Sequence, residues 1–149
     1  EEAQDADLSD IVHDAATAAA RARDAGPDRL KVSAEAGIAV AVRRNALKRC
    51  TTNLIDNALK HGKHVDVTLK RSGKSVGIVV DDDGPGIPEA RREEAFRPFH
   101  RLDQGRNLQT GGSGLGLAIA RDIARAHGGD LLLNDSPMGG LRATLRLPV

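Results

Sequence analysis

Residues 111–117 read Gly-Gly-Ser-Gly-Leu-Gly-Leu and run directly into Ala-Ile-Ala-Arg-Asp-Ile-Ala-Arg-Ala-His-Gly-Gly. Glycines let backbone N–H groups approach an anion closely, because no side chain stands in the way. The N-terminus of the helix that follows adds unpaired N–H donors and the positive end of its dipole. A glycine cluster that opens a long amphipathic helix therefore predicts a phosphate-binding site.

Two further segments strengthen this prediction. One reads Asn53-Leu-Ile-Asp-Asn57-Ala-Leu-Lys60-His61, and the other reads Asp82-Asp83-Gly84-Pro85-Gly86-Ile87. The first places amide and basic side chains on a helix, and the second places carboxylates beside glycines. A glycine cluster alone is a modest signal, whereas the three segments together indicate a nucleotide site.

Composition limits the classes of protein to consider. At 149 residues the chain is expected to form one domain with a real core. The formal net charge is +1 and the basic residues form no stripe, so we expect no nucleic-acid partner. The single cysteine, Cys50, excludes an internal disulfide framework and suits a reducing compartment. Because the chain begins at Glu1 rather than Met, we expect a piece of a longer protein, whose remainder can include a membrane segment.

Apolar periodicity predicts three long helices and several strands. The helices cover residues 7–24, 44–61 and 113–127, with Asp7 or Ser9 capping the first and Gly62 ending the second. The strands are Leu30–Val32, Ile38–Val42, Val65–Leu69, Val76–Val80, Asp130–Asn134 and Leu141–Leu147. Helices and antiparallel hairpins are interspersed without βαβ regularity. The pattern favours an α+β fold, a two-layer α/β sandwich in which a mixed, mostly antiparallel sheet packs on three long helices.

Asp82 is the strongest single candidate for ligand binding. It shares parity with Val76, Ile78 and Val80, so it projects to the face of the sheet that carries the buried residues. A carboxylate there needs a partner, and an adenine amino group is a good one. The alternative is a turn aspartate, which fits Asp83 better. Beside Asp82, the glycines at 84 and 86 keep side chains away, so that a ligand base can lie against the backbone.

The second candidate group is a polar strip on the helix over residues 44–61. Magnesium keeps most of its waters and takes few protein oxygens besides phosphate, so the amide of Asn57 suits it. Lys60 supplies a point charge for phosphate and His61 a ring N–H. Asn53 takes part too, or merely orients Asn57 or caps a neighbouring turn. The alternative for all four is a solvated helix face.

A long loop separates this region from the glycine cluster. Pro88 starts a short helix that extends to about Phe96, and residues 97–112 are polar, contain glycine and lack periodicity. A loop of this length inside a small domain is usually functional. It has the properties of a lid over a nucleotide, in which Arg101 either reaches a terminal phosphate or is solvated.

These segments resemble those of a known family. Asn53–His61 resembles the N box of sensor histidine kinases, and Asp82–Ile87 resembles their first glycine box. Phe96–Phe99 resembles their F box, and Gly112–Leu117 their second glycine box. The order and spacing match over about residues 5–149, and the Phe-Arg-Pro-Phe-His-Arg run at residues 96–101 is most similar to the osmosensing EnvZ-type kinases.

The resemblance implies the Bergerat-type ATP-binding sandwich, shared with gyrase B, Hsp90 and MutL, and it implies ATP and Mg²⁺ as cofactors. It implies that Asp82 binds adenine, beside Gly84, Gly86 and Ile87, and that Asn57 binds magnesium. It also gives Asn57 and Lys60 the catalytic roles. His61 departs from the family pattern, because an aromatic tyrosine or phenylalanine is frequent there. The remaining nucleotide contacts expected from the resemblance are those of Asn53, Lys60, His61, Arg101, Gly112, Ser113, Gly114, Leu115, Gly116 and Leu117.

The resemblance further implies a reaction and partners. The γ-phosphoryl group of ATP passes to a histidine on a separate dimerisation domain, and then to an aspartate of a response regulator. That histidine lies on a helical hairpin that precedes this domain, and we find no such hairpin in the chain. We therefore expect residues 1–149 to be the catalytic and ATP-binding domain alone, monomeric, and cytoplasmic in a parent protein of the bacterial inner membrane.

Two other functions stay open. One is an ATP-sensing module that binds nucleotide without phosphotransfer, since the boxes specify binding more directly than turnover. The other is a GHKL-type ATPase of the gyrase, Hsp90 or MutL kind. Such an ATPase needs a glutamate early in the N-box helix to activate water, whereas Arg49-Cys50-Thr51-Thr52 precedes Asn53 here.

Overall fold

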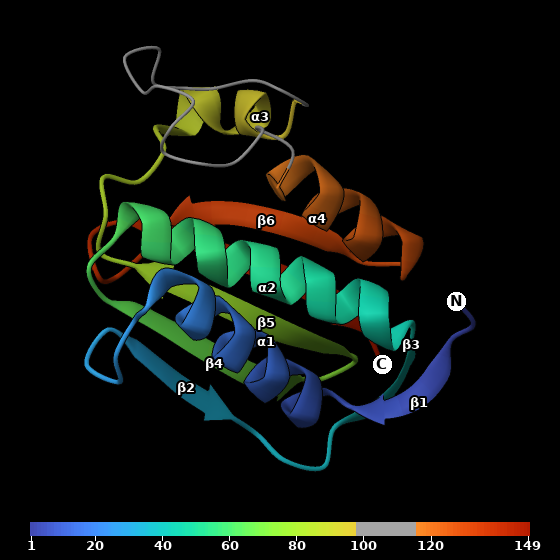
Figure 1. Cartoon of the computed structure of the whole chain (residues 1–149). Coiled ribbons are helices and arrows are strands. Elements are labelled where there is room, and N and C mark those ends of the chain that lie inside the picture. The colour runs from blue at the N-terminus through green and yellow to red at the C-terminus, as the bar shows by residue number, and fades with distance from the viewer. Residues whose placement is uncertain (98–115) are drawn as a thin grey trace.

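The computed structural model describes residues 1–97 and 116–149. In this part of the chain a five-stranded sheet forms one layer, and three long helices cover one of its faces (Figure 1). The helices are α1 (Leu8–Arg23), α2 (Arg44–His61) and α4 (Gly116–Ala126). Asp7 caps α1, because its carboxylate accepts a hydrogen bond from the Ser9 N–H at 2.9 Å. The expected two-layer α+β sandwich is confirmed.

The sheet has the strand order β2-β4-β5-β7-β6. Its strands are β2 (Leu30–Ala34), β4 (Val65–Ser72), β5 (Ser75–Asp82), β6 (Asp130–Asp135) and β7 (Leu141–Pro148). The β2–β4 pair is parallel and the other three pairs are antiparallel, which confirms both predicted hairpins. Because β5 is the central strand, its C-terminal end is flanked on both sides by other strands.

Alternation along β5 decides which of its side chains enter the core. Val76, Ile78 and Val80 are buried, and they join the apolar cluster beneath the helices. Asp82 continues the same parity and is 3% exposed. The prediction that this carboxylate points toward the buried layer is confirmed.

Two segments differ from the sequence-based expectation. The single short helix expected from Pro88 to Phe96 is instead a 3₁₀ turn, η1 (Glu89–Arg91), followed by a one-turn helix, α3 (Arg92–Ala95). The Arg91 N–H bonds the Pro88 carbonyl three residues back, at 2.8 Å, which is the 3₁₀ pattern. The second segment is β1 (Gln4–Asp7), which we did not expect because it is short and polar. It pairs antiparallel with β3 (Ala39–Val42) in a separate two-stranded sheet.

Helix α2 receives the cap of its first turn from a distant residue. Its N-cap residue, Arg43, makes no side-chain capping hydrogen bond. Instead the Glu1 carboxylate accepts from the N–H groups of Asn45 at 2.8 Å and Ala46 at 3.1 Å. A carboxylate is favourable there because the N-terminus of a helix carries unpaired donors and positive dipole charge. The helix is therefore anchored by residues outside its own sequence.

Candidate nucleotide-binding site

The Asp82 carboxylate lies at the C-terminal end of β5. Its Oδ1 atom accepts hydrogen bonds from the backbone N–H groups of Gly84 at 2.9 Å and Leu141 at 3.1 Å. Burial raises the pKa of this carboxyl above its ordinary value, despite the two hydrogen bonds, and the neighbouring Asp83 and Asp81 add to the rise. Within residues 1–97 and 116–149, no donor or cation reaches Oδ2. Within the described residues, this oxygen therefore remains able to accept a hydrogen bond.

Glycines enclose the carboxylate on several sides. A Cβ at position 62 would lie 3.0 Å from the Asp82 Cβ, and one at position 140 would lie 2.6 Å from both Asp82 O and Gly84 N. A Cβ at position 84 would lie 2.6 Å from the His61 carbonyl oxygen. Gly62 ends α2 as predicted, but with an extended φ of −113°, so packing rather than a left-handed turn requires glycine there. Gly140 was not among the predicted site residues, yet its backbone lies directly against Asp82 and Gly84.

The residues after Gly84 continue this backbone-lined region. Gly86 adopts a φ of +71°, which favours glycine, and a Cβ there would lie 3.4 Å from the Gly140 carbonyl. Ile87 is partly buried against the core. Its carbonyl accepts from the Arg92 guanidinium at 3.0 Å, which ties the segment to α3.

The polar strip on α2 leads toward Asp82. Asn53, Asn57, Lys60 and His61 are all half-buried. Lys60 and His61 form the last turn of the helix, and the His61 carbonyl lies against Gly84. Asn57 and Asn53 follow one and two turns back along the helix. The structure thus brings the end of the first predicted segment against the start of the second.

The third predicted segment is described only in part. Gly116 is exposed and Leu117 is partly buried, both at the start of α4. Phe96 of the F box packs under the Arg121 guanidinium of α4, which lies 4.2 Å from the ring centroid. The other predicted members fall outside the described residues: Phe99, Arg101, Gly112, Ser113, Gly114 and Leu115.

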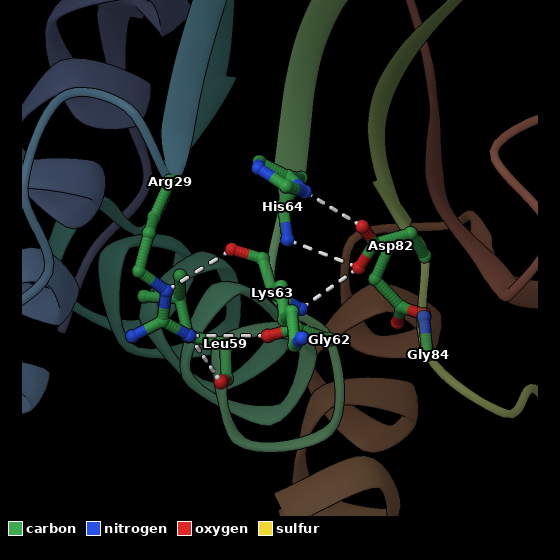
Figure 2. A network of polar contacts seen from close by, with 8 residues as sticks. Arg29, Leu59, Gly62, Lys63, His64, Asp82 and Gly84 are labelled. Carbon is green, nitrogen blue, oxygen red and sulfur yellow. Dashed lines mark hydrogen bonds and ion pairs between the residues drawn. The ribbon is translucent and has the colours of Figure 1, made fainter.

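Two charged side chains that the sequence analysis did not assign to the site hold the turn after α2 (Figure 2). The Arg29 guanidinium donates to the carbonyls of Leu59 at 2.8 Å, Gly62 at 3.0 Å and Lys63 at 3.0 Å. On the other side Asp83 accepts from the backbone N–H of Lys63 at 2.8 Å and of residue 64 at 3.0 Å. No local sequence signal identifies Arg29, because its partners lie 30 to 34 positions away.

The donor set suits a metal held chiefly by a ligand. No group of three or more His, Cys, Asp or Glu side chains in the described residues is placed to hold a metal ion. One amide oxygen, such as that of Asn57, fits Mg²⁺, which retains waters and binds phosphate oxygens. In residues 1–97 and 116–149, none of the helices is both long and apolar enough to cross a bilayer.

Comparison with known proteins agrees with this arrangement. The family described as "Histidine kinase-, DNA gyrase B-, and HSP90-like ATPase" matches residues 42–149. The chain belongs to this family. Within it, the chain is 50% identical over 103 residues, 69% of its length, to the sensor histidine kinase GtrS of Pseudomonas aeruginosa. It is 41% identical over 143 residues, 95% of its length, to the signal transduction histidine-protein kinase AfsQ2 of Streptomyces coelicolor. The chain is thus the ATP-binding catalytic domain of the sensor histidine kinase type.

Solved structures of similar sequence share this fold. The ATP-binding domain of PrrB from Mycobacterium tuberculosis is 34% identical with a TM-score of 0.76, covering 99% of this chain and 98% of that one. The histidine kinase domain of the E. coli osmosensor EnvZ is 32% identical with a TM-score of 0.72, covering 100% and 90%. The expected relationship to EnvZ is confirmed. The chain spans 21% of the length of GtrS and 26% of AfsQ2, so those relatives are much longer proteins.

Proposed function

We propose that this domain binds Mg-ATP and transfers the γ-phosphoryl group to a histidine on a separate dimerisation domain, in two-component signal transduction. One observation carries the proposal. A buried carboxylate, Asp82, keeps one oxygen without a donor among the described residues, and it lies directly beside the α2 turn that bears Lys60 and His61. A ligand with an amino group at one end and phosphates at the other matches this pair of features.

The residues divide the nucleotide between them. Asp82 accepts a hydrogen bond from the adenine amino group, and the backbone at Gly84, Gly86 and Ile87 lies along the base. Asn57 contributes its amide oxygen to Mg²⁺, which neutralises phosphate charge when bound. The remaining proposed phosphate contacts are those of Asn53, Lys60, His61, Arg101, Gly112, Ser113, Gly114, Leu115, Gly116 and Leu117.

The chemistry asks for positioning rather than for an acid–base pair in this domain. The acceptor imidazole nitrogen forms a bond to the γ-phosphorus as the bond to the leaving oxygen of ADP breaks. Catalysis of such a transfer rests on alignment and charge neutralisation. Lys60 supplies a positive charge at the end of α2, and Asn57, three residues earlier on the same helix, would hold the ion through its amide oxygen. A general base for the acceptor histidine belongs to the domain that carries it.

The proposal extends to the parent protein. Residues 1–149 act as the catalytic and ATP-binding domain, separate from the phosphoacceptor domain, and the phosphohistidine passes its group to a response regulator. The domain works in the cytoplasm, the parent protein resides in the bacterial inner membrane, and the isolated domain is a monomer. Sedimentation of the purified chain tests the last point, and a stable dimer would contradict it.

The first test is calorimetric titration with ATP and ADP, with and without Mg²⁺. We expect Asp82→Asn to abolish binding, and Asn57→Ala to remove the magnesium dependence of ATP binding while ADP alone still binds. Two variants serve as controls: Asp66→Asn removes a carboxylate from the neighbouring strand β4, and Asn45→Ala removes an exposed amide from the far end of α2. A folded wild-type chain that binds no adenine nucleotide would overturn the proposal.

A second test separates phosphotransfer from its alternatives. The chain is incubated with ATP labelled on the γ-phosphate and a dimerisation domain that bears the phosphoacceptor histidine. Label on the histidine supports the kinase function. Binding without transfer to any such domain would favour an ATP-sensing module, and steady ATP hydrolysis by the chain alone would favour an ATPase of the gyrase type.

A further inference from the structure

The turn after helix α2 is held by two side chains of opposite charge. A cation binds its backbone carbonyls, and an anion binds its backbone N–H groups. The Arg29 guanidinium donates hydrogen bonds to three backbone carbonyls, those of Leu59, Gly62 and Lys63, at 2.8 to 3.0 Å. The Asp83 carboxylate receives two N–H groups, those of Lys63 and His64, and its Oδ2 lies 2.7 Å from the His64 ring Nδ1. Figure 2 shows Arg29 approaching this turn from one side, opposite the end of β5 that carries the aspartates.

The end of α2 needs such partners. The last carbonyls of a helix have no intrahelical donor and carry the negative end of its dipole. Gly62 leaves α2 with extended backbone, so this helix end does not adopt the left-handed conformation on which a Schellman cap depends. A guanidinium suits the position, because its planar fork offers several donors and a charge that does not titrate.

Asp83 has the corresponding role for the backbone N–H groups of the turn, which donate to its carboxylate. Its hydrogen bonds from His64, through backbone N–H and ring, and from the Lys63 N–H lower the pKa of the carboxyl to about 2. The carboxylate is thus ionised at neutral pH and acts as a permanent acceptor for the turn. It directly follows Asp82, so the residue proposed to bind adenine and the residue that holds the turn are consecutive.

The held turn is in contact with the nucleotide site. Gly62 packs against the Asp82 Cβ, and the His61 carbonyl packs against Gly84. Lys60 and His61 belong to the last helical turn, whose Leu59 carbonyl Arg29 binds. Movement of this turn would therefore shift the proposed phosphate-binding residues relative to the carboxylate that binds the base.

We propose that Arg29 and Asp83 are positioning residues of the nucleotide site. Together they set the spacing between the phosphate-binding end of α2 and the adenine-binding Asp82, without contacting the nucleotide themselves. The inference rests on the proposed function, because it assigns phosphates to Lys60 and His61. It predicts a selective defect: variants of Arg29 or Asp83 lose affinity that comes from phosphates and keep affinity that comes from the base.

The experiment measures the dissociation constants of ATP and adenosine, both with Mg²⁺, for wild type, Arg29→Ala and Asp83→Ala. We expect ATP to bind about tenfold more weakly in each variant, the effect of one lost charge-assisted hydrogen bond. Adenosine affinity should change by no more than about twofold, because Asp82 and its two N–H donors stay in place. The ratio of the two constants is the readout, since loss of folding stability alone lowers both affinities together.

Arg23→Ala is the matched control. Arg23 also ties a neighbouring element to α2, through a two-point ion pair with Asp56 at 2.6 and 3.1 Å, but it does so away from the C-terminal turn. We expect it to lower the melting temperature without changing the ratio of ATP to adenosine affinity. In Asp83→Asn, unlike Asp83→Ala, the ratio of ATP to adenosine affinity should stay near the wild-type value. The amide oxygen of asparagine can still accept from both backbone N–H groups.

The outcomes separate this inference from the function it rests on. If Arg29→Ala does not fold, Arg29→Lys replaces it, because the lysine ammonium keeps the positive charge but lacks the planar fork of donors. The ratio of ATP to adenosine affinity in Arg29→Lys should lie between those of wild type and Asp83→Ala. A ratio that stays at the wild-type value in Arg29→Lys and Asp83→Ala, while wild type binds ATP, would overturn the positioning role alone. A wild-type chain that binds neither ligand would overturn both proposals.

Discussion

Two neighbouring aspartates on β5 show what distinguishes the two faces of the sheet. Asp81 and Asp82 are 5% and 3% exposed, yet they point to opposite faces. Both Asp81 oxygens are bound by the Arg142 guanidinium of β7, at 2.8 and 3.0 Å. Among the residues that the structure describes, Asp82 is bound at Oδ1 alone, and its two partners are backbone N–H groups.

We propose that the difference separates a structural carboxylate, Asp81, from a ligand-binding one, Asp82. The Arg142 guanidinium compensates the charge of Asp81, and the pair links two strands. Asp82 has no cation bound to it in the described part of the chain, and burial raises its pKa. An uncompensated carboxylate in a buried position is costly to the fold, and such costs are concentrated at functional sites. The comparison therefore predicts that changes on the Asp81 face alter stability alone, whereas changes on the Asp82 face alter binding as well.

The largest effect on stability is expected from a methyl group on the ligand face. In Gly140→Ala the new Cβ would lie 2.6 Å from Asp82 O and Gly84 N, and closer still to Asp82 Oδ1. These are largely backbone atoms that cannot move independently, so we expect a loss of about 2–3 kcal/mol in the free energy of unfolding, together with weaker ATP binding. Urea denaturation and calorimetry measure the two effects.

Gly77→Ala is the counterpart on the opposite face. Among the described residues its Cβ would meet Thr144 Cγ2 at 3.6 Å and Val79 Cγ2 at 3.8 Å, which are ordinary contacts. Because alanine is better than glycine in a strand, we expect stability to stay level or rise by about 0.5 kcal/mol, with ATP affinity unchanged. Equal losses in the two variants would break the distinction between the faces.

The next largest effect on stability is expected from loss of the ion pair between Asp81 and Arg142. Asp81→Asn leaves Arg142 with one weaker acceptor in place of a two-point ion pair. The Arg142 side chain is 40% exposed, so water compensates part of the loss, and we expect about 1–2 kcal/mol of destabilisation. ATP affinity should stay within about twofold of wild type. Asp66→Asn, on the facing position of β4, is the control and should cost less. A large fall in ATP affinity in Asp81→Asn would show that the two faces are coupled.

Much of this division could be predicted from local sequence patterns. Strand alternation placed Asp82 on the buried face, and apolar periodicity placed α2 over residues 44–61, with Gly62 next. Such predictions succeed because they depend on the period of a single element. The family resemblance then assigned the polar strip and the glycines to a nucleotide, and the comparisons confirm the family.

What could not be predicted depends on contacts between distant elements. Arg29 precedes β2 in the chain, and nothing in its neighbourhood indicates that it binds the end of α2. Gly140 is explained by the approach of a hairpin loop to Asp82 and Gly84, which appears only in the folded chain. The division of the expected helix into η1 and α3 depends on a choice between 3₁₀ and α hydrogen bonds. The helix preferences of the residues do not distinguish these two patterns.

The most specific effect concerns the charge of Asp82. In Asp82→Asn the amide oxygen can keep both N–H donors, while the amide nitrogen takes the place of Oδ2. The folded-state pKa of Asp82 is raised, so its ionised form destabilises the fold at any pH above that pKa. We expect the variant to melt a few degrees higher than wild type at pH 7, although it no longer binds nucleotide.

The pH dependence of this gain tests its cause. As the pH falls through the raised pKa, wild-type Asp82 becomes protonated in the fold and its penalty disappears. The stability advantage of Asp82→Asn should therefore shrink on acidification and vanish near pH 3.8, the ordinary pKa of an aspartate.

Asp83→Asn should change stability in the opposite direction. The lowered pKa of Asp83 means that its ionised form stabilises the fold, and that contribution is lost from about pH 4 down to about 2. If Asp82→Asn were less stable than wild type at neutral pH, the carboxylate would be a structural element like Asp81, and the contrast between the two faces would fail at the residue that defines it.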